Sequence, residues 1–239
     1  LAGVSFTPEE RAVIAGEIAD QVERFQKRRA WSSMPETTWP ALTFNPVLAQ
    51  VGIRRATTTT GAWTPRTTRK RLPVDETQIA FASLADLSHW ISTRQISSVD
   101  LTKLYLDRLE RYDAHLECVI TLMPDHALEQ ARRADDELAR GIRRSALHGI
   151  PWGAKDLFDT AGVRTTWGAA PFRDRVPETS ATVVNRLDDA GAVLVAKLTL
   201  GALAYGDRWF GGRTNSPWNV EVGSSGSSAG SAAATAAGL

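Results

Sequence analysis

Apolar residues recur at helical spacing in several stretches of this chain, and short continuous apolar runs separate those stretches. Residues 7–29 predict a helix, because Thr7 offers an N-cap, Pro8 a first helical position and Glu10 a capping-box carboxylate. The apolar positions of this helix are Ile14, Ile18, Val22 and Phe25. Charged residues cover its other face, which is typical of a packing or interaction helix.

Residues 31–78 have a different character, since the following prolines interrupt every period: Pro35, Pro40, Pro46, Pro65 and Pro73. Together with the threonine run 57–60, they predict extended, irregular chain. The same segment contains a short basic run, which consists of Arg66, Arg69, Lys70 and Arg71. No aromatic residues interleave with it for stacking on bases, so a solvated linker is favoured over a nucleic-acid site. We therefore expect residues 1–78 to form an N-terminal extension and residues 79–239 a domain.

Helical patterns alternate with buried strands from residue 79 onward. We predict helices over 83–93, from a cap at Ser98, from Pro124 to Gly141, over 180–190 behind a cap at Ser180, and over 198–205. Continuous apolar runs at 118–122 and 192–196 predict buried strands. This alternation predicts an α/β fold whose sheet is largely covered by helices.

The composition narrows the classes of function. With 43% hydrophobic and 23% charged residues the chain can bury a sizeable core, and a net charge of +1 provides no overall basic field for nucleic acid. No apolar run is long enough to span a membrane, and no signal peptide is visible. A cytoplasmic location is favoured, although a removed signal peptide stays an option because the chain begins at Leu1.

Cysteine and histidine usage narrows the chemistry further. The single cysteine, Cys118, rules out an intramolecular disulfide framework. His89, His115 and His126 have no cysteine or carboxylate at ligand spacing, and His148 is interpreted as a loop or packing residue. We therefore predict no metal site.

The segment 223–239 consists of Gly, Ser and Ala in all but two positions. It is either a flexible tail or a Gly/Ser loop that leads into a helix over 231–237. A phosphate-binding P-loop is excluded because no lysine follows Gly230. Residues 226–230 match the letters of a G-x-S-x-G nucleophile elbow, but the preceding 218–222 is a poor buried strand. The remaining alternative pairs the serines of this loop with a lysine.

Lys155 is the lysine that suits this pairing. It follows the apolar run 150–152, where a charge is costly to bury. It either extends to solvent or pairs with Asp156, or it is a desolvated lysine with a lowered pKa that acts as a general base.

Four segments in order resemble motifs of the amidase signature family. Residues 147–156 resemble its lysine motif, G-[VI]-P-x-x-x-K-[DE], and residues 190–197 resemble its A-G-A-x-x-x-G/A-K strand. Residues 215–219 are similar to its N-P-W-[ND] turn with one additional serine, and residues 226–234 resemble its G-S-S-x-G-S-A signature. The resemblance covers about residues 79–239, and residues 1–78 match no part of the family core.

The resemblance implies an amidase-signature fold with a mixed sheet and a cofactor-free Ser–cis-Ser–Lys amidohydrolase. Lys155 matches the catalytic lysine, Ser227 the serine on a cis peptide bond, and Ser228 its structural neighbour, between Gly226 and Gly230 of the loop. Neutral Lys155 would take a proton from Ser227, which would relay it from the attacking serine. The expected partner is a small-molecule amide, with neither nucleic acid nor membrane, and a homodimer is an option.

One departure from the family pattern concerns the nucleophile. The family's acyl-accepting serine lies in a later Gly-Gly-Ser-type loop, and only 12 residues follow Ser227. We therefore expect the fold to be incomplete in this chain, the reading frame to continue past Leu239, and residues 1–239 alone to be inactive. In the family, the region that corresponds to residues 201–212 lies near the acyl pocket, so Tyr205, Asp207 and Trp209 are expected to line the substrate. Trp167, which follows the lysine strand, is expected to do the same.

Two other functions stay open. One is an amidotransferase A-type subunit, which passes ammonia from glutamine to a tRNA-linked acyl group and works with partner proteins. The N-terminal extension disfavours this alternative. The other is a non-catalytic binding module with the same fold. Peptide amides, aryl amides, fatty amides and ureas all stay open as substrates.

Overall fold

The computed structural model describes residues 5–30 and 71–239, and these two stretches belong to separate compact units. The first stretch contains helix α1, Pro8–Ala30. Glu10 Oε2 accepts a hydrogen bond from the Thr7 N–H at 2.8 Å, and Thr7 Oγ1 accepts one from the Glu10 N–H at 3.2 Å. The predicted helix and its capping box are thus confirmed.

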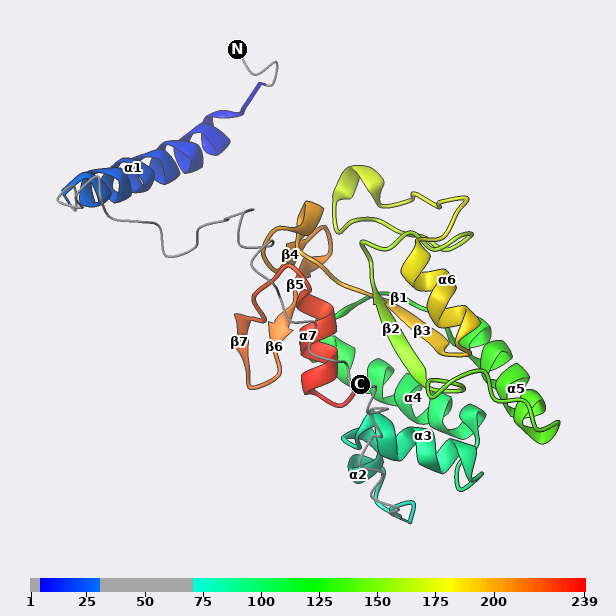
Figure 1. The fold of residues 1–239 in the computed structure, drawn as a ribbon. Coiled ribbons are helices and arrows are strands. Elements are labelled where there is room, and N and C mark those ends of the chain that lie inside the picture. Colours follow the sequence, from blue (N-terminus) through cyan, green and yellow to red (C-terminus); the bar gives the residue numbers. More distant parts are fainter. Residues whose placement is uncertain (1–4, 31–70) are drawn as a thin grey trace, which may run out of the picture. The chain divides into compact units, whose positions relative to one another are not determined.

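The second stretch is built on a three-stranded mixed sheet in the order β1-β3-β2 (Figure 1). Its strands are β1 (Val119–Leu122), β2 (Pro151–Lys155) and β3 (Val193–Leu198). Strand β3 lies in the centre, antiparallel to β1 and parallel to β2. Every residue of β3 is buried, including Lys197. The apolar run 192–196 predicted a buried strand here.

The helices of this unit are α2 (Glu76–Ala80), α3 (Leu84–Ser92), α4 (Ser98–Leu116), α5 (Pro124–Ala139), α6 (Thr182–Asp189) and α7 (Ala229–Ala236). Two short hairpins lie between β3 and α7: β4 (Arg208–Trp209) with β5 (Gly212–Arg213), and β6 (Asn215–Ser216) with β7 (Asn219–Gly223). Single 3-10 turns occur at Ala170–Phe172 and Ala202–Ala204. Helices therefore cover the sheet, and the hairpins lead the chain into α7.

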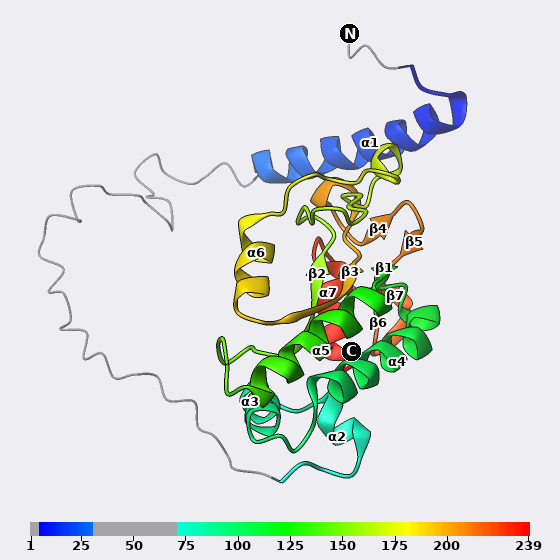
Figure 2. The same ribbon diagram turned by 90° about the vertical axis from the view of Figure 1, so that its right-hand side faces the viewer.

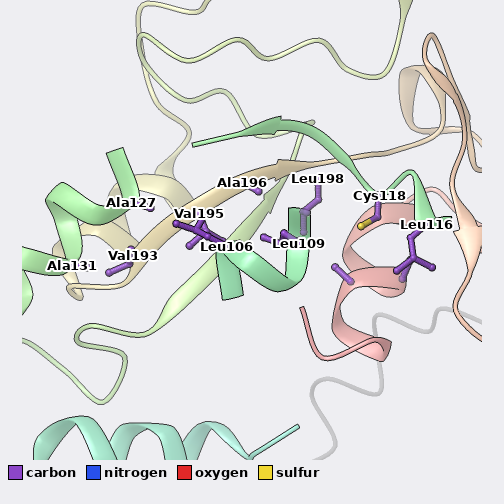
Figure 3. Packing of buried hydrophobic residues seen from close by; sticks show 12 residues of the cluster. Leu106, Leu109, Leu116, Cys118, Ala127, Ala131, Val193, Val195, Ala196 and Leu198 are labelled. Carbon is purple, nitrogen blue, oxygen red and sulfur yellow. The ribbon is translucent and has the colours of Figure 1, made fainter. Parts of the chain in front are cut away.

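The main hydrophobic core joins α4, α5 and α7 to strand β3 (Figure 3). Its buried members are Leu106, Leu109, Leu116, Cys118, Ala127, Ala131, Val193, Val195, Ala196, Leu198, Ala233 and Ala234. Small alanines on α5 and α7 let these helices approach the sheet closely. A second cluster packs α2 and α3 against α4 (Figure 2), and it consists of Ile79, Leu87, Trp90, Ile91, Leu101, Tyr105 and Ile150.

A register shift between β2 and β3 decides where two lysines point. The pairing moves by one residue between Trp152 and Gly153. Beyond the shift, Lys155 lies beside Leu198, and Lys197 lies beside Ala154. Paired residues share a face of the sheet. The two lysines therefore point to opposite faces, and Lys155 shares the face against which α7 packs.

Several local predictions are wrong. The cap of α4 is Ser97, whose hydroxyl accepts from the Asp100 N–H, whereas the Ser98 N–H bonds the Asp135 carboxylate. Ser180 does not cap α6, because its hydroxyl accepts from the Ala161 N–H. In both cases the predicted serine bonds a group elsewhere in the fold, and the cap position falls on the adjacent residue, Ser97 or Ala181.

Two longer segments also differ from expectation. Residues 198–205 form no α-helix, because β3 continues to Leu198 and positive φ at Leu203 and Ala204 leaves a single 3-10 turn. The predicted irregular segment 31–78 lies largely outside the described residues, as do Arg66, Arg69 and Lys70 of its basic run. Its last part begins α2 at Glu76, which Asp75 caps through the Thr77 N–H.

Candidate active site

Lys155 ends strand β2 and reaches the Gly/Ser loop that precedes α7. Its Nζ donates to Ser227 Oγ at 2.9 Å and to Ser228 Oγ at 3.0 Å. Burial lowers the pKa of Lys155 below its ordinary value, because desolvation disfavours the charged form. The side chain is half-buried, as is Ser227, whereas Ser228 is exposed. A lysine with a lowered pKa beside two hydroxyl groups can exchange protons with them.

The peptide bond between Gly226 and Ser227 is cis, as the resemblance implies. Two backbone hydrogen bonds fix the loop around this peptide bond. The Ser225 N–H donates to Asp207 Oδ2 at 3.2 Å, and the Ser224 N–H donates to the Thr214 carbonyl at 2.9 Å. A β-carbon on Gly226 would lie 1.8 Å from the Gly206 oxygen. Glycine is therefore required at position 226 for the loop to pass this close to the Gly206 backbone.

Gly230 fixes the start of α7 against the sheet. Its N–H donates to the Thr199 carbonyl at 3.0 Å. A β-carbon there would lie 2.4 Å from the Cys118 oxygen and 2.5 Å from the Thr199 nitrogen. The first turn of α7 can therefore contact the end of β3 this closely only with glycine at position 230.

Replacing Gly230 by alanine is expected to lower the free energy of unfolding by about 1–3 kcal/mol, because backbone atoms cannot move aside cheaply. The midpoint of thermal unfolding measures this effect. The matched control is Gly16→Ala, a helical position with no atom within 4 Å of the added carbon. This control should leave the midpoint unchanged or raise it. Equal midpoints for wild type and Gly230→Ala would contradict the close packing of α7.

The expected substrate-lining residues separate into different environments. Tyr205 is 88% exposed. Asp207 accepts a hydrogen bond from the Ser225 N–H and so supports the Gly/Ser loop that precedes α7, called the serine loop below. Trp209 packs edge-on against Phe210, with ring centroids 5.0 Å apart. The structure thus brings Asp207 to the serine loop, through contacts with the backbone of that loop.

Trp167 lies on the segment that follows β2. Its ring packs 4.9 Å from Phe172, and the Arg175 guanidinium lies 4.2 Å from the ring centroid. It also borders an open cavity of about 340 Å³ together with Leu157, Phe158, Asp159, Thr179, Ser180 and Ala181. None of the serine-loop residues lines this cavity.

A buried ion pair adjacent to Lys155 was not predicted as part of the site. Lys197 Nζ lies 3.1 Å from Asp156 Oδ1, and both side chains are fully buried. Asp156 Oδ2 accepts from the Thr166 N–H at 2.7 Å and from its hydroxyl at 2.6 Å. Lys197 Nζ also donates to Thr165 Oγ1 at 2.7 Å and to the Phe158 carbonyl at 2.9 Å.

This pair ties the segment after β2 to the end of β3. Burial lowers the pKa of Lys197, and the Asp156 carboxylate opposes that shift. The Asp156 N–H also donates to the Leu198 carbonyl at 2.8 Å. The signals that could have identified the pair are a lysine directly after the continuous apolar run 192–196 and a motif that places an aspartate after Lys155.

Within residues 5–30 and 71–239, no cluster of three or more His, Cys, Asp or Glu side chains could hold a metal ion. In the same ranges, no helix combines the length and apolar character needed to cross a membrane.

Comparison with known proteins decides the family. The family model for Amidase matches residues 100–239, which is more than half of the chain. The chain belongs to the amidase signature family. It is 42% identical over 160 residues to the A-type subunit of a glutamyl-tRNA(Gln) amidotransferase from Marinomonas sp. (strain MWYL1). That match covers 66% of this chain and 33% of the relative, so the chain spans about a third of the length of its curated relative.

Solved structures of the amidase signature family show the same fold. The peptide amidase from Stenotrophomonas maltophilia matches with a TM-score of 0.59 and 35% identity over 64% of this chain and 33% of its own. A fatty acid amide hydrolase matches with a TM-score of 0.65 and 26% identity, covering 70% of this chain and 30% of its own. The mixed α/β arrangement predicted from the sequence is thus confirmed across about a third of the length of these structures.

Proposed function

We propose that the complete protein hydrolyses the C–N bond of a carboxamide, with Lys155 as the base and Ser227 as the proton relay. The observation that carries this proposal is the 2.9 Å hydrogen bond from Lys155 Nζ to Ser227 Oγ, which joins residues 72 positions apart. Membership of the amidase signature family supports the same roles. The lowered pKa of Lys155 favours the neutral amine that a base must be.

In the proposed mechanism, the oxygen of a nucleophilic serine bonds to the amide carbonyl carbon. Its proton passes to Ser227 Oγ, while the Ser227 proton passes to neutral Lys155. Collapse of the tetrahedral adduct breaks the C–N bond, and the proton returns along the same path to the leaving nitrogen. Water then releases the acyl group as a carboxylic acid, with the relay acting again as the base.

The proposed nucleophile is a serine in a Gly-Gly-Ser-type loop outside residues 1–239. The alternative within this chain is Ser228, because its hydroxyl also lies 3.0 Å from Lys155 Nζ. In the proposal, Ser228 and the backbone of Gly226 and Gly230 shape the loop, and Asp207 supports it through the Ser225 N–H. Trp167, Tyr205 and Trp209 are the proposed substrate-lining residues. Neither a metal ion nor an organic cofactor is needed for these proton transfers.

The test is release of ammonia from a panel of carboxamides by the complete purified protein, with a peptide amide, an aryl amide, a fatty amide and urea as probes. Ser227→Ala should lower the rate about 10²–10⁴-fold, because the relay between base and nucleophile is lost. The matched control is Ser225→Ala, which keeps the backbone N–H that binds Asp207 and should keep the wild-type rate. Equal rates for Ser227→Ala and wild type would contradict the relay.

A second candidate function is favoured by the identity to the amidotransferase relative. A transferase of that kind would pass ammonia from glutamine to an acyl group on tRNA and would need partner proteins. The two functions differ in one observable property. A hydrolase releases ammonia on its own, whereas the transferase would require its partners and the acyl-tRNA acceptor. Turnover that appears only with those additions would replace the hydrolase proposal by this one.

A further inference from the structure

Helix α1 exposes a continuous apolar stripe. Ile14, Ile18, Val22 and Phe25 are 37%, 54%, 49% and 57% exposed, and no residue of the helix is buried. These positions recur every three or four residues, so they lie along one face. A helix with such a stripe gains stability when a second apolar surface covers it.

The charges beside this stripe are ordered along the helix. Glu10, Glu17 and Arg24 recur every seven residues, and Arg28 follows one turn after Arg24. Residues at this spacing lie on one flank of a helix. The flank is therefore acidic in its first half and basic in its second half. An anionic membrane surface would instead favour basic residues along the whole polar face. The observed pattern therefore favours a partner surface that also has one acidic half and one basic half.

We propose that α1 pairs antiparallel with α1 of a second copy of this chain. With the crossing point between Ile18 and Val22, Ile18 packs against the partner's Val22, and Ile14 against the partner's Phe25. The same alignment places Glu17 beside the partner's Arg24 and Glu10 beside the partner's Arg28. Two-fold symmetry repeats each of these contacts. A parallel pair would instead place the acidic halves together and the basic halves together.

Other charges on α1 are compatible with this arrangement. Lys27 already pairs with Glu23 of the same helix at 2.7 Å, away from the stripe. Arg11 and Arg29 lie at the two ends of the stripe, so Arg11 would face the partner's Arg29 at the open ends of the pair. Both side chains can extend into water there, which limits the affinity without preventing association.

The test is sedimentation equilibrium of the complete protein and three charge variants over a range of concentrations. Glu17→Arg and Arg24→Glu should each weaken dimerisation about tenfold, because each places like charges together twice. The double variant Glu17→Arg/Arg24→Glu should restore the wild-type affinity, because its charges are again complementary. All four proteins should release ammonia equally if the proposed hydrolase activity holds, and the dimerisation result does not depend on that activity.

Each alternative occupant of the stripe gives a different result. If α1 packs on residues 71–239 of its own chain, the wild type will sediment as a monomer at every concentration. If the protein dimerises through another surface, Glu17→Arg and Arg24→Glu will leave the affinity unchanged. A double variant as weak as either single variant would overturn the antiparallel alignment. Any of these three results contradicts the proposal.

Discussion

Lys155→Met is expected to lower the rate of amide hydrolysis by the complete protein about 10²–10⁴-fold, while the protein stays folded. Methionine keeps the length of the side chain but removes the Nζ that donates to Ser227 and Ser228. The substitution removes the proposed base and retains the packing of the half-buried stem. Steady-state ammonia release and the thermal unfolding midpoint, measured on the same preparation, separate the two effects.

The pH dependence of the wild-type rate tests the same residue independently. In the proposed mechanism the neutral amine is the active form, so the rate should rise with pH through the pKa of Lys155. Because burial lowers that pKa, the rise should lie below the ordinary lysine value of 10.5. A rate that rises only at or above this value, or a Lys155→Met variant with wild-type turnover, would contradict the role of Lys155 as base.

Lys197→Met is expected to lower the free energy of unfolding by about 3–5 kcal/mol, the usual effect of removing one partner from a buried ion pair. The substitution leaves the Asp156 carboxylate fully buried with its Thr166 donors but without the ammonium group 3.1 Å away. The midpoint of urea or thermal unfolding measures the loss. Since the pair connects the end of β3 to the residue after Lys155, the activity should fall together with the stability.

Two further variants isolate the charge effect. Lys103→Met makes the same substitution at an exposed position of α4, and it should change the stability by less than about 0.5 kcal/mol. The double variant Asp156→Asn/Lys197→Met removes both charges and should recover part of the loss. If the double variant is as unstable as Lys197→Met, lost packing rather than an unpaired charge is responsible.

The sequence predicted the parts of the fold that depend on local pattern. The capping box at Thr7 and Glu10 and the apolar run that became β3 both specify their elements without help from distant residues. The helix expected over 198–205 failed because its residues are held by distant groups. The Thr199 N–H donates to the Cys118 carbonyl, and the Thr199 carbonyl accepts from the Gly230 N–H. Such tertiary hydrogen bonds override local helix propensity.

The residues of the candidate site likewise divide into those that sequence motifs predict and those that only tertiary contacts bring together. Lys155, Ser227 and Ser228 could be identified because they lie in motifs of a known family, and the structure brings their polar atoms within hydrogen-bonding distance. The pairing of Lys197 with Asp156 depends on the register shift between β2 and β3, which no local pattern reveals. The support that Asp207 gives to the serine loop likewise joins residues 18 positions apart.

The central proposal, a serine–lysine amidase with Ser227 as relay, is tested most directly by labelling the complete protein with a fluorophosphonate and mapping the labelled peptide by mass spectrometry. The proposal predicts a label on a serine outside residues 1–239, and loss of that label in Lys155→Met. A label on Ser228 would assign the nucleophile to the loop before α7. A label that persists in Lys155→Met, or no label at all, would contradict the serine–lysine mechanism.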